Sequence, residues 1–278
     1  MNKLGFGFLR LPQIAEDEID FKTLNQMVDL FLEKGGNYFD TAYTYLNGNS
    51  EIALRECVVK RYPRDSFLIC DKLPSWYIKS HEDCNIYFEK QLKRCGVTYF
   101  DVYMIHWLNE TNYYICEKYD QFKFLKNLKK EGKAKKIGFS YHDNAKLLDK
   151  ILNKHPEVDY VQLQINYLDW NSPYIEAKKC LEVAKAHNKK VIVMEPVKGG
   201  TLANLPDDAV NILKDINKDN SIASWAIRFA QSIDQVEIVL SGMNSVEQVI
   251  DNMRHIKPLC DYEFEALNNV CRIIESNT

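Results

Sequence analysis

The sequence predicts an α/β fold, a closed (β/α)8 TIM barrel that forms a single domain over residues 1–278. Short runs rich in β-branched and aromatic residues alternate with segments of helical periodicity, and this alternation implies parallel strands joined by helical crossovers. Eight such pairs are present, at a length near the ~250 residues usual for this fold. Polar residues also fall at the ends of the predicted strands, where a barrel gathers its reactive groups.

The elements follow one another regularly. The predicted strands are residues 4–11, 37–41, 67–73, 99–107, 136–140, 160–167, 190–196 and 236–241. The helical segments are residues 17–34, 51–61, 81–95, 122–131, 144–153, 173–187, 221–230 and 245–255, with a closing helix over 261–275 and a loop-rich insertion over 199–218. An open doubly wound sheet would share the alternation, but Arg10 stands where its GxGxxG turn needs the third glycine, so the barrel is preferred.

Composition excludes several kinds of partner. The net charge of −3 and the isoelectric point near 6.1 give no long-range attraction to nucleic acid or to an anionic membrane, so a small-molecule partner is expected. No apolar run approaches the ~20 residues that span a bilayer, and the N-terminus lacks a signal-like apolar segment. The eight cysteines show no CxxC spacing, which predicts reduced thiols and a cytoplasmic location.

Four residues near the ends of neighbouring predicted strands form the candidate catalytic set, Asp40, Tyr45, Lys72 and His106. Each alone has a structural explanation, such as a turn cap for Asp40 or a core histidine for His106. Together they suggest more, because a lysine and a histidine within apolar strands are costly unless they are paired or hydrogen-bonded.

A chemical role follows from the side-chain types. A phenol has a pKa near ~10, and an ammonium group beside it stabilises the phenolate and lowers that value. Lys72 can supply the ammonium, Asp40 can keep it charged, and His106 can orient a carbonyl oxygen. Such a set donates a proton to a developing oxyanion, which suits carbonyl reduction when another group supplies hydride.

Several motifs with this spacing resemble the aldo-keto reductases. They are F-D-T-A-x-x-Y at residues 39–45, Asp71-Lys72, the segment 92–107 that ends in I-H-W, and G-K-x-x-x-I-G-x-S at 132–140. The resemblance runs from the first strand to Asn252. It implies that Tyr45 is the general acid, that Lys72 and Asp40 tune it, and that His106 orients the substrate carbonyl.

The resemblance also implies a nicotinamide dinucleotide lying extended over the barrel mouth. The residues it nominates for cofactor contact follow strands five to eight and are Ser140, Gln164, Met194, Glu195, Pro196, Val197, Gly199, Ser241, Gly242, Met243, Gln248 and Asn252. Many members place Asn after the strand-five serine, where this chain has Tyr141. Many also stack an aromatic ring on the nicotinamide, where this chain offers Met194-Glu195-Pro196.

Cofactor preference is the largest departure from the family pattern. A lysine and an arginine often clamp the 2′-phosphate of NADPH, and the matching positions here are Gly242 and Gln248. Lys198 and Arg254 are candidate replacements. Family habit favours NADP(H), and the missing clamp leaves NAD(H) as the alternative.

Residues 3–12, 138–143, 194–196 and 240–243 narrow the resemblance to a bacterial branch whose longer members end in a ferredoxin-like iron–sulfur tail. Cys260 and Cys271 lack cluster spacing, so we predict no cluster and no other metal site in these 278 residues. An iron–sulfur tail would be present only in a longer product.

Two other functions fit parts of the pattern. A regulatory or electron-transfer-coupled subunit would keep the barrel and the cofactor but turn over little carbonyl substrate. A Schiff-base aldolase would use Lys72 as its nucleophile. The aromatic residues Trp76, Trp107, Tyr141 and Trp170 are candidates for lining the substrate pocket, and they would equally serve to pack the rim.

Overall fold

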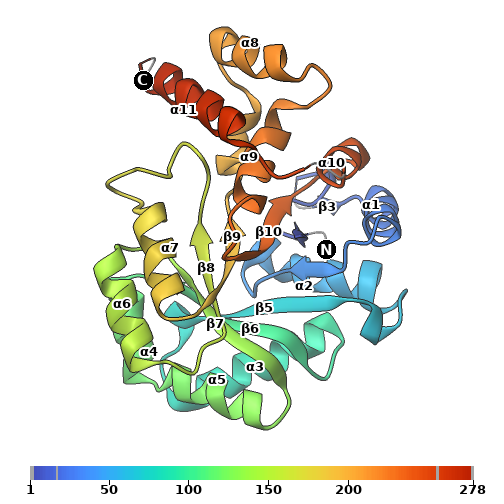
Figure 1. Ribbon diagram of the computed structural model, residues 1–278. Coiled ribbons are helices and arrows are strands. Elements are labelled where there is room, and N and C mark those ends of the chain that lie inside the picture. The colour runs from blue at the N-terminus through green and yellow to red at the C-terminus, as the bar shows by residue number, and fades with distance from the viewer. Residues whose placement is uncertain (1–2, 17, 255–256, 277–278) are drawn as a thin grey trace.

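The computed structural model describes residues 3–16, 18–254 and 257–276. It confirms the closed barrel of eight parallel strands (Figure 1). The strands are β1 (Leu4–Gly7), β4 (Tyr38–Asp40), β5 (Leu68–Pro74), β6 (Phe100–Leu108), β7 (Ala134–Tyr141), β8 (Tyr160–Gln164), β9 (Lys190–Met194) and β10 (Val236–Gly242). The sheet closes because β1 pairs with β4 on one side and with β10 on the other.

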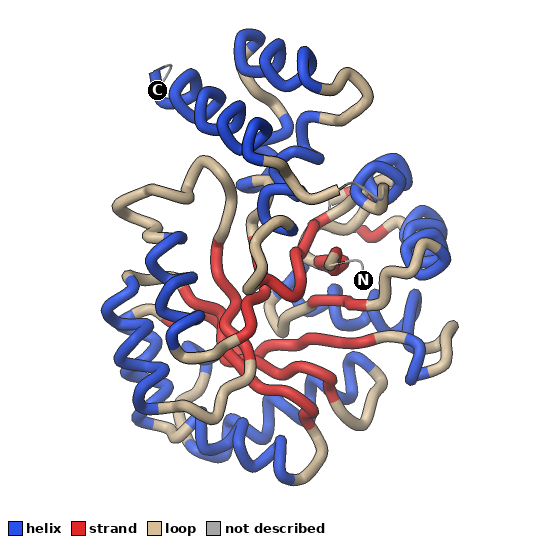
Figure 2. The backbone as a smooth tube through the Cα atoms, in the orientation of Figure 1, coloured by secondary structure: helices blue, strands red, loops and turns tan. Residues whose placement is uncertain are grey.

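Helices surround the strands (Figure 2). They are α1 (Phe21–Glu33), α2 (Asn49–Leu54), α3 (His81–Cys95), α4 (Glu110–Lys118), α5 (Gln121–Lys130), α6 (Ala145–Lys154), α7 (Ala177–Ala186), α8 (Asp207–Ile216), α9 (Ile222–Gln231), α10 (Val246–Asn252) and α11 (Asp261–Ser276). Local sequence sets several of their starts, since the side chains of Ser80, Asn144 and Ser221 each accept a hydrogen bond from a backbone N–H of the first turn.

Several predicted boundaries differ from the structure. The first strand ends at Gly7, and a small hairpin of β2 (Gln13–Ala15) and β3 (Glu18–Ile19) follows it. The first helix begins at Phe21 because Asp20 caps it, whereas the predicted start at residue 17 lies outside the described residues, as does the predicted helix end at residue 255.

Two helices were missed by the sequence reading. α4 occupies a segment to which no element was assigned, and α8 lies inside the predicted loop-rich insertion 199–218. α8 has ten residues, buries Ala209 and Leu213, and carries its apolar residues at helical spacing. It lies beside α11 at one end of the molecule (Figure 1), and this contact explains how so short a helix is stabilised.

The barrel interior explains how the strands direct side chains to one end. The inner core is formed by the side chains of Tyr38, Cys70, Val102, Met104, Ile192 and Leu240. Successive side chains of a strand alternate between faces, so the residue two positions further along points in the same direction. Asp40 follows Tyr38 in this way, Lys72 follows Cys70, and His106 follows Met104. These three polar side chains therefore continue the interior toward the C-terminal end of the barrel.

The cysteines serve mainly as core residues. All eight are free, and six of them are buried. Among the described residues, no helix combines the length and the apolar character needed to cross a lipid bilayer.

Candidate active site

A cavity of about 600 Å³ opens at the C-terminal end of the barrel, within the range of small-molecule sites of roughly 300–1,000 Å³. Its wall is made by residues at or just after the strand ends. From the first half of the chain they include Gly7, Arg10, Asp40, Tyr45, Trp76, His106 and Trp107, and from the second half Ser140, Gln162, Met194, Glu195, Ser241, Gly242, Gln248 and Asn252. The structure thus brings side chains from most of the barrel strands to one place.

Lys72 and Asp40 form the buried ion pair at the base of this cavity. Lys72 Nζ lies 2.5 Å from Asp40 Oδ1 and donates a second hydrogen bond to the backbone oxygen of Thr41 at 2.7 Å. Burial favours the neutral amine, but Asp40 and Tyr45 outweigh it and raise the pKa of Lys72 above its ordinary value. A Schiff-base nucleophile needs a neutral amine, so this environment disfavours the aldolase alternative.

Tyr45 lies above this ammonium group. Its ring centroid is 5.1 Å from Lys72 Nζ, and its loop is fixed by Ser50, whose hydroxyl contacts Thr41 Oγ1 and donates to the backbone oxygen of Phe8. Burial raises the pKa of Tyr45 to about 12, although Lys72 acts in the opposite direction. The expectation of a lowered phenol pKa was therefore wrong in this structure, because the loss of solvation exceeds the effect of the ammonium.

His106 faces Tyr45 across the cavity floor. The two ring centroids are 5.7 Å apart and nearly perpendicular. Burial and the nearby Lys72 charge lower the pKa of His106 well below 6.5, so the imidazole is neutral at neutral pH. Its Nδ1 is buried with no hydrogen-bond partner among the described residues. A neutral imidazole and a protonated phenol are the forms suited to hydrogen bonding with a carbonyl oxygen.

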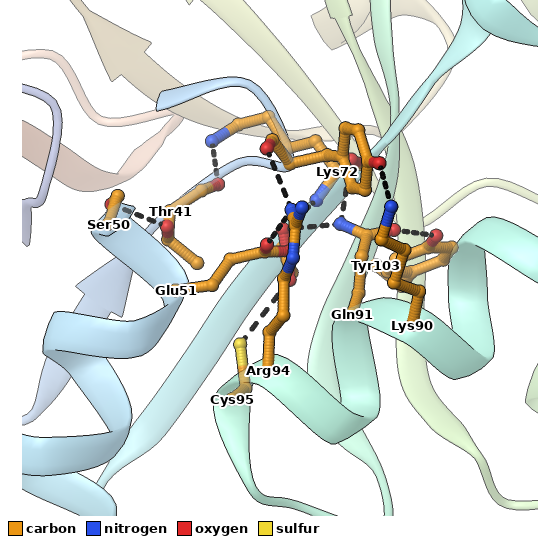
Figure 3. Close-up of polar contacts among 11 residues, drawn as sticks. Thr41, Ser50, Glu51, Lys72, Lys90, Gln91, Arg94, Cys95 and Tyr103 are labelled. Atoms are coloured by element: carbon orange, nitrogen blue, oxygen red, sulfur yellow. Dashed lines mark hydrogen bonds and ion pairs between the residues drawn. The ribbon is translucent and has the colours of Figure 1, made fainter. Parts of the chain in front are cut away.

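A second polar cluster holds the backbone of Lys72 from behind (Figure 3). Asp71 Oδ1 accepts hydrogen bonds from the Lys72 backbone N–H at 2.7 Å and from Gln91 Nε2 at 2.7 Å. Gln91 Nε2 also donates to the Lys72 backbone oxygen at 3.0 Å, and Tyr103 donates to Gln91 Oε1 at 2.6 Å. All of these groups are fully buried, so the position of the ammonium is fixed by strands β5 and β6 and by helix α3.

Glu51 adjoins Asp71 in this cluster. Glu51 Oε2 accepts a hydrogen bond from Arg94 at 2.8 Å, whereas Oε1 is buried with no partner among the described residues. Burial raises the pKa of both carboxyls, and the mutual repulsion of the two charges adds to the rise for Asp71. We therefore expect the pair to retain one proton at neutral pH, since Arg94 balances only one of the two charges.

This retained proton makes stability depend on pH in a defined direction. A carboxyl whose folded pKa is raised stabilises the fold below its unfolded pKa, and that contribution falls as the pH rises toward the folded value. The free energy of unfolding of the wild type, measured in urea, should therefore fall by up to about 1.4 kcal/mol per pH unit above pH 5 relative to that of Glu51→Gln. Glu56→Gln, at a partly exposed position away from this cluster, is the control, and equal slopes in all three proteins would show that no proton is retained.

Most of the predicted cofactor residues lie on the cavity wall, with two exceptions. Gln164 Nε2 donates instead to Asp169 Oδ2 at 2.9 Å, and Met243 is fully buried in the outer core. Gln162 takes the place expected for Gln164. It is the direct neighbour of Ser140 in the pairing of β7 with β8, and both side chains are buried on the cavity wall.

Ser140 and Gln162 also carry polar atoms without partners. Ser140 Oγ and Gln162 Oε1 are buried and make no hydrogen bond among the described residues. Buried polar groups are normally satisfied, so such atoms at a cavity wall indicate a ligand with complementary polar groups. A carboxamide, as in nicotinamide, offers both a donor and an acceptor. The residues present therefore fit a nicotinamide at this point.

Of the aromatic residues predicted to line the substrate pocket, two lie on the cavity wall and two pack elsewhere. Trp76 and Trp107 line the cavity with ring centroids 5.6 Å apart, whereas Trp170 packs on Phe229. Tyr141 is buried, and its hydroxyl donates to the backbone oxygen of Asn144.

Neither proposed replacement for the phosphate clamp is among the described residues that line the cavity. Lys198 Nζ pairs with Asp169 Oδ1 at 2.6 Å. Arg254 Nη1 donates to the backbone oxygen of Asp219 at 2.8 Å.

A closed barrel with an ion pair, a phenol and an imidazole at its C-terminal mouth defines a barrel enzyme equipped for acid–base chemistry on a small molecule. The sequence profile of the Aldo/keto reductase family matches residues 3–272. The chain belongs to this family and is an NAD(P)H-dependent oxidoreductase that acts on carbonyl groups.

Relatives with assigned activities are similar over most of the chain. A 9,11-endoperoxide prostaglandin H2 reductase of Trypanosoma cruzi is 28% identical over 236 residues, which cover 82% of this chain and 75% of the relative. A glycerol 2-dehydrogenase (NADP(+)) of Saccharomyces cerevisiae is 23% identical over 265 residues, covering 87% and 80%. Each name describes that relative's own activity.

Solved structures share the fold. An aldo-keto reductase from Bacillus halodurans in its holo form superimposes with a TM-score of 0.78 at 22% identity, covering 96% of this chain and 91% of that one. An aldo-keto reductase from Klebsiella pneumoniae in complex with NADPH gives a TM-score of 0.76 at 17% identity, covering 96% and 90%. At this level of identity the similarity establishes a common fold.

Proposed function

We propose that this protein reduces an aldehyde or ketone to an alcohol, with Tyr45 as the general acid. The observation that carries the proposal is the convergence of three groups on one cavity: the Lys72–Asp40 pair, the Tyr45 ring 5.1 Å from the ammonium, and the neutral His106 facing that ring. A nicotinamide dinucleotide bound in the cavity would supply hydride to the carbonyl carbon. The residues of the chain control the carbonyl oxygen.

Each residue has a separate task at that oxygen. His106, neutral because its pKa is lowered, donates a hydrogen bond that directs the carbonyl toward Tyr45. Tyr45 transfers its hydroxyl proton as negative charge develops on the oxygen, and its raised pKa keeps that proton in place at neutral pH. The phenolate that remains is stabilised by the Lys72 ammonium, which Asp40 holds in position.

The cavity wall suggests the kind of carbonyl compound accepted. Trp76 and Trp107 form an aromatic side next to His106, and the Trp76 and His106 ring centroids are 5.3 Å apart. Flat apolar surface beside the proton donor favours aldehydes or ketones with an aromatic or other apolar substituent. A panel of aromatic, aliphatic and hydroxylated carbonyl compounds with NADPH and NADH tests both activity and preference. No carbonyl-dependent oxidation with either nucleotide would refute the proposal.

Ser140 and Gln162 are proposed to bind the nicotinamide carboxamide. Replacing Gln162 with leucine should weaken nucleotide binding about three- to tenfold, as expected for one or two neutral hydrogen bonds. Gln164→Leu is the matched control, because Gln164 bonds to Asp169 away from Ser140 and its change should alter the affinity less than about twofold. Quenching of tryptophan fluorescence measures both dissociation constants. A larger loss in Gln164→Leu would restore the role first given to Gln164.

A further inference from the structure

Arg10 reaches across the mouth of the cavity from the loop after β1. Among the described residues that line the cavity, it is the one arginine or lysine. Its Nη2 lies 3.7 Å from Glu195 Oε1, and the two side chains are 49% and 36% exposed. A long, solvated ion pair of this kind contributes little stability, so the guanidinium is free to change partners.

Two glycines lie beside this side chain. A Cβ atom at Gly242 would lie 3.6 to 3.8 Å from Arg10 Cβ, Cγ and Cδ, and one at Gly199 would lie 3.5 Å from Nη2. The stem of Arg10 therefore passes over the end of β10, and its head reaches the segment that follows β9. Because glycine has no side chain, nothing from these two positions lies between the guanidinium and a ligand placed between the ends of the two strands.

Acidic side chains near Glu195 would repel an anionic ligand unless a cation faced that ligand. Glu195 and Asp251 lie on the cavity wall and carry acidic groups, whereas Lys198 and Arg254 are engaged elsewhere. A phosphate group placed near Glu195 would be repelled unless Arg10 faced it. Arginine binds phosphate oxygens with two parallel hydrogen bonds, which is a stronger arrangement than the observed contact with Glu195.

We propose that Arg10 binds a phosphate group of the nicotinamide dinucleotide and that Glu195 holds the guanidinium in this position until the phosphate replaces it. The inference rests on the proposed function for the identity of the nucleotide. The ligand chemistry is a phosphate oxyanion, from the pyrophosphate bridge or from the 2′-phosphate of NADPH. Glu195 is then a competitor of the cofactor, not one of its ligands.

Opposite effects of two variants test this exchange of partners. Arg10→Gln removes the cation and leaves Glu195 facing the phosphate, so the dissociation constant should rise roughly ten- to a hundredfold. Glu195→Gln frees Arg10 and removes a repulsive charge, so binding should become about two- to tenfold tighter. Fluorescence titration with NADPH and NADH measures these values. A bridge that merely holds the loops together would weaken binding in both variants, and that result would overturn the proposal.

Comparison of the two nucleotides identifies which phosphate Arg10 binds, and two further variants serve as controls. Loss of affinity for both nucleotides in Arg10→Gln assigns the pyrophosphate, and loss for NADPH alone assigns the 2′-phosphate. Arg10→Lys should recover part of the affinity, and its dependence on salt concentration should exceed that of Arg10→Gln. Arg61→Gln, which breaks an outer ion pair with Asp29, is the control for a general loss of charge.

The two proposals fail in different ways. If the wild type binds and oxidises a reduced nucleotide but Arg10→Gln binds it equally well, only the role of Arg10 is wrong. If the wild type binds neither nucleotide, both the proposed function and the role of Arg10 are overturned. Thermal unfolding of each variant establishes that a change in affinity reflects the altered side chain.

Discussion

Tyr45→Phe should lower the rate of carbonyl reduction by about a hundredfold to ten-thousandfold while leaving nucleotide affinity nearly unchanged. The variant keeps the ring that contacts His106 and removes only the hydroxyl whose proton is transferred. General acids of this kind contribute about 10²- to 10⁴-fold to a rate. Steady-state kinetics with the preferred carbonyl compound, together with fluorescence titration of the nucleotide, separate the two effects.

A matched tyrosine makes this comparison specific. Tyr43 lies two residues earlier in the same loop and contacts Arg94 and Lys90 on the outside of the site. Tyr43→Phe should change the reduction rate less than about twofold, since its hydroxyl is bound to Lys90 Nζ. If Tyr45→Phe reduced carbonyl compounds as fast as the wild type, another group would have to donate the proton.

Lys72→Met should affect both turnover and stability. It removes the charge that stabilises the Tyr45 phenolate, and it leaves Asp40 buried without its ammonium partner. Breaking a buried ion pair by removing one partner costs about 3–5 kcal/mol. Urea unfolding should show a decrease of this size in the free energy of unfolding. The rate of carbonyl reduction should be no higher than that of Tyr45→Phe.

The double variant Asp40→Asn/Lys72→Met separates stability from catalysis. Neither buried charge remains in it, so part of the unfolding free energy should return. Turnover should not return, because the phenolate still has no cation beside it. A double variant no more stable than Lys72→Met would mean that the cost arises from lost packing and not from an unpaired Asp40.

The fold could be predicted because the barrel repeats one pattern eight times. The strand-like runs are mostly rich in β-branched and aromatic residues, and their regular alternation with segments of helical periodicity indicates the topology even where one run, residues 4–11, contains no β-branched residue. α8 was missed because residues 199–218 were assigned as one loop-rich insertion, although Ala209, Ile212, Leu213 and Ile216 recur there at helical spacing. The hairpin of β2 and β3 was missed because its strands contain three and two residues.

The four candidate catalytic residues could be located because each follows an inward-facing core residue near the end of a strand or lies in the loop directly after it. Gln162 was missed because its position beside Ser140 depends on the register between β7 and β8, and two glutamines of the same strand face the same way. The pKa of Tyr45 was predicted in the wrong direction because burial is a property of the folded chain. The sequence analysis used Arg10 only to argue against a GxGxxG turn. A role at the cavity could not be predicted, because its contact with Glu195 joins segments that are far apart in the sequence.

Stopped-flow mixing of the protein–nucleotide complex with an aromatic aldehyde tests the central claim most directly. The account predicts that bound NADPH or NADH is oxidised once per chain in a single turnover and that Tyr45→Phe slows this phase by at least about a hundredfold. Tight nucleotide binding with no carbonyl-dependent oxidation in the wild type would contradict it. That outcome would favour a cofactor-binding regulatory or electron-transfer-coupled subunit.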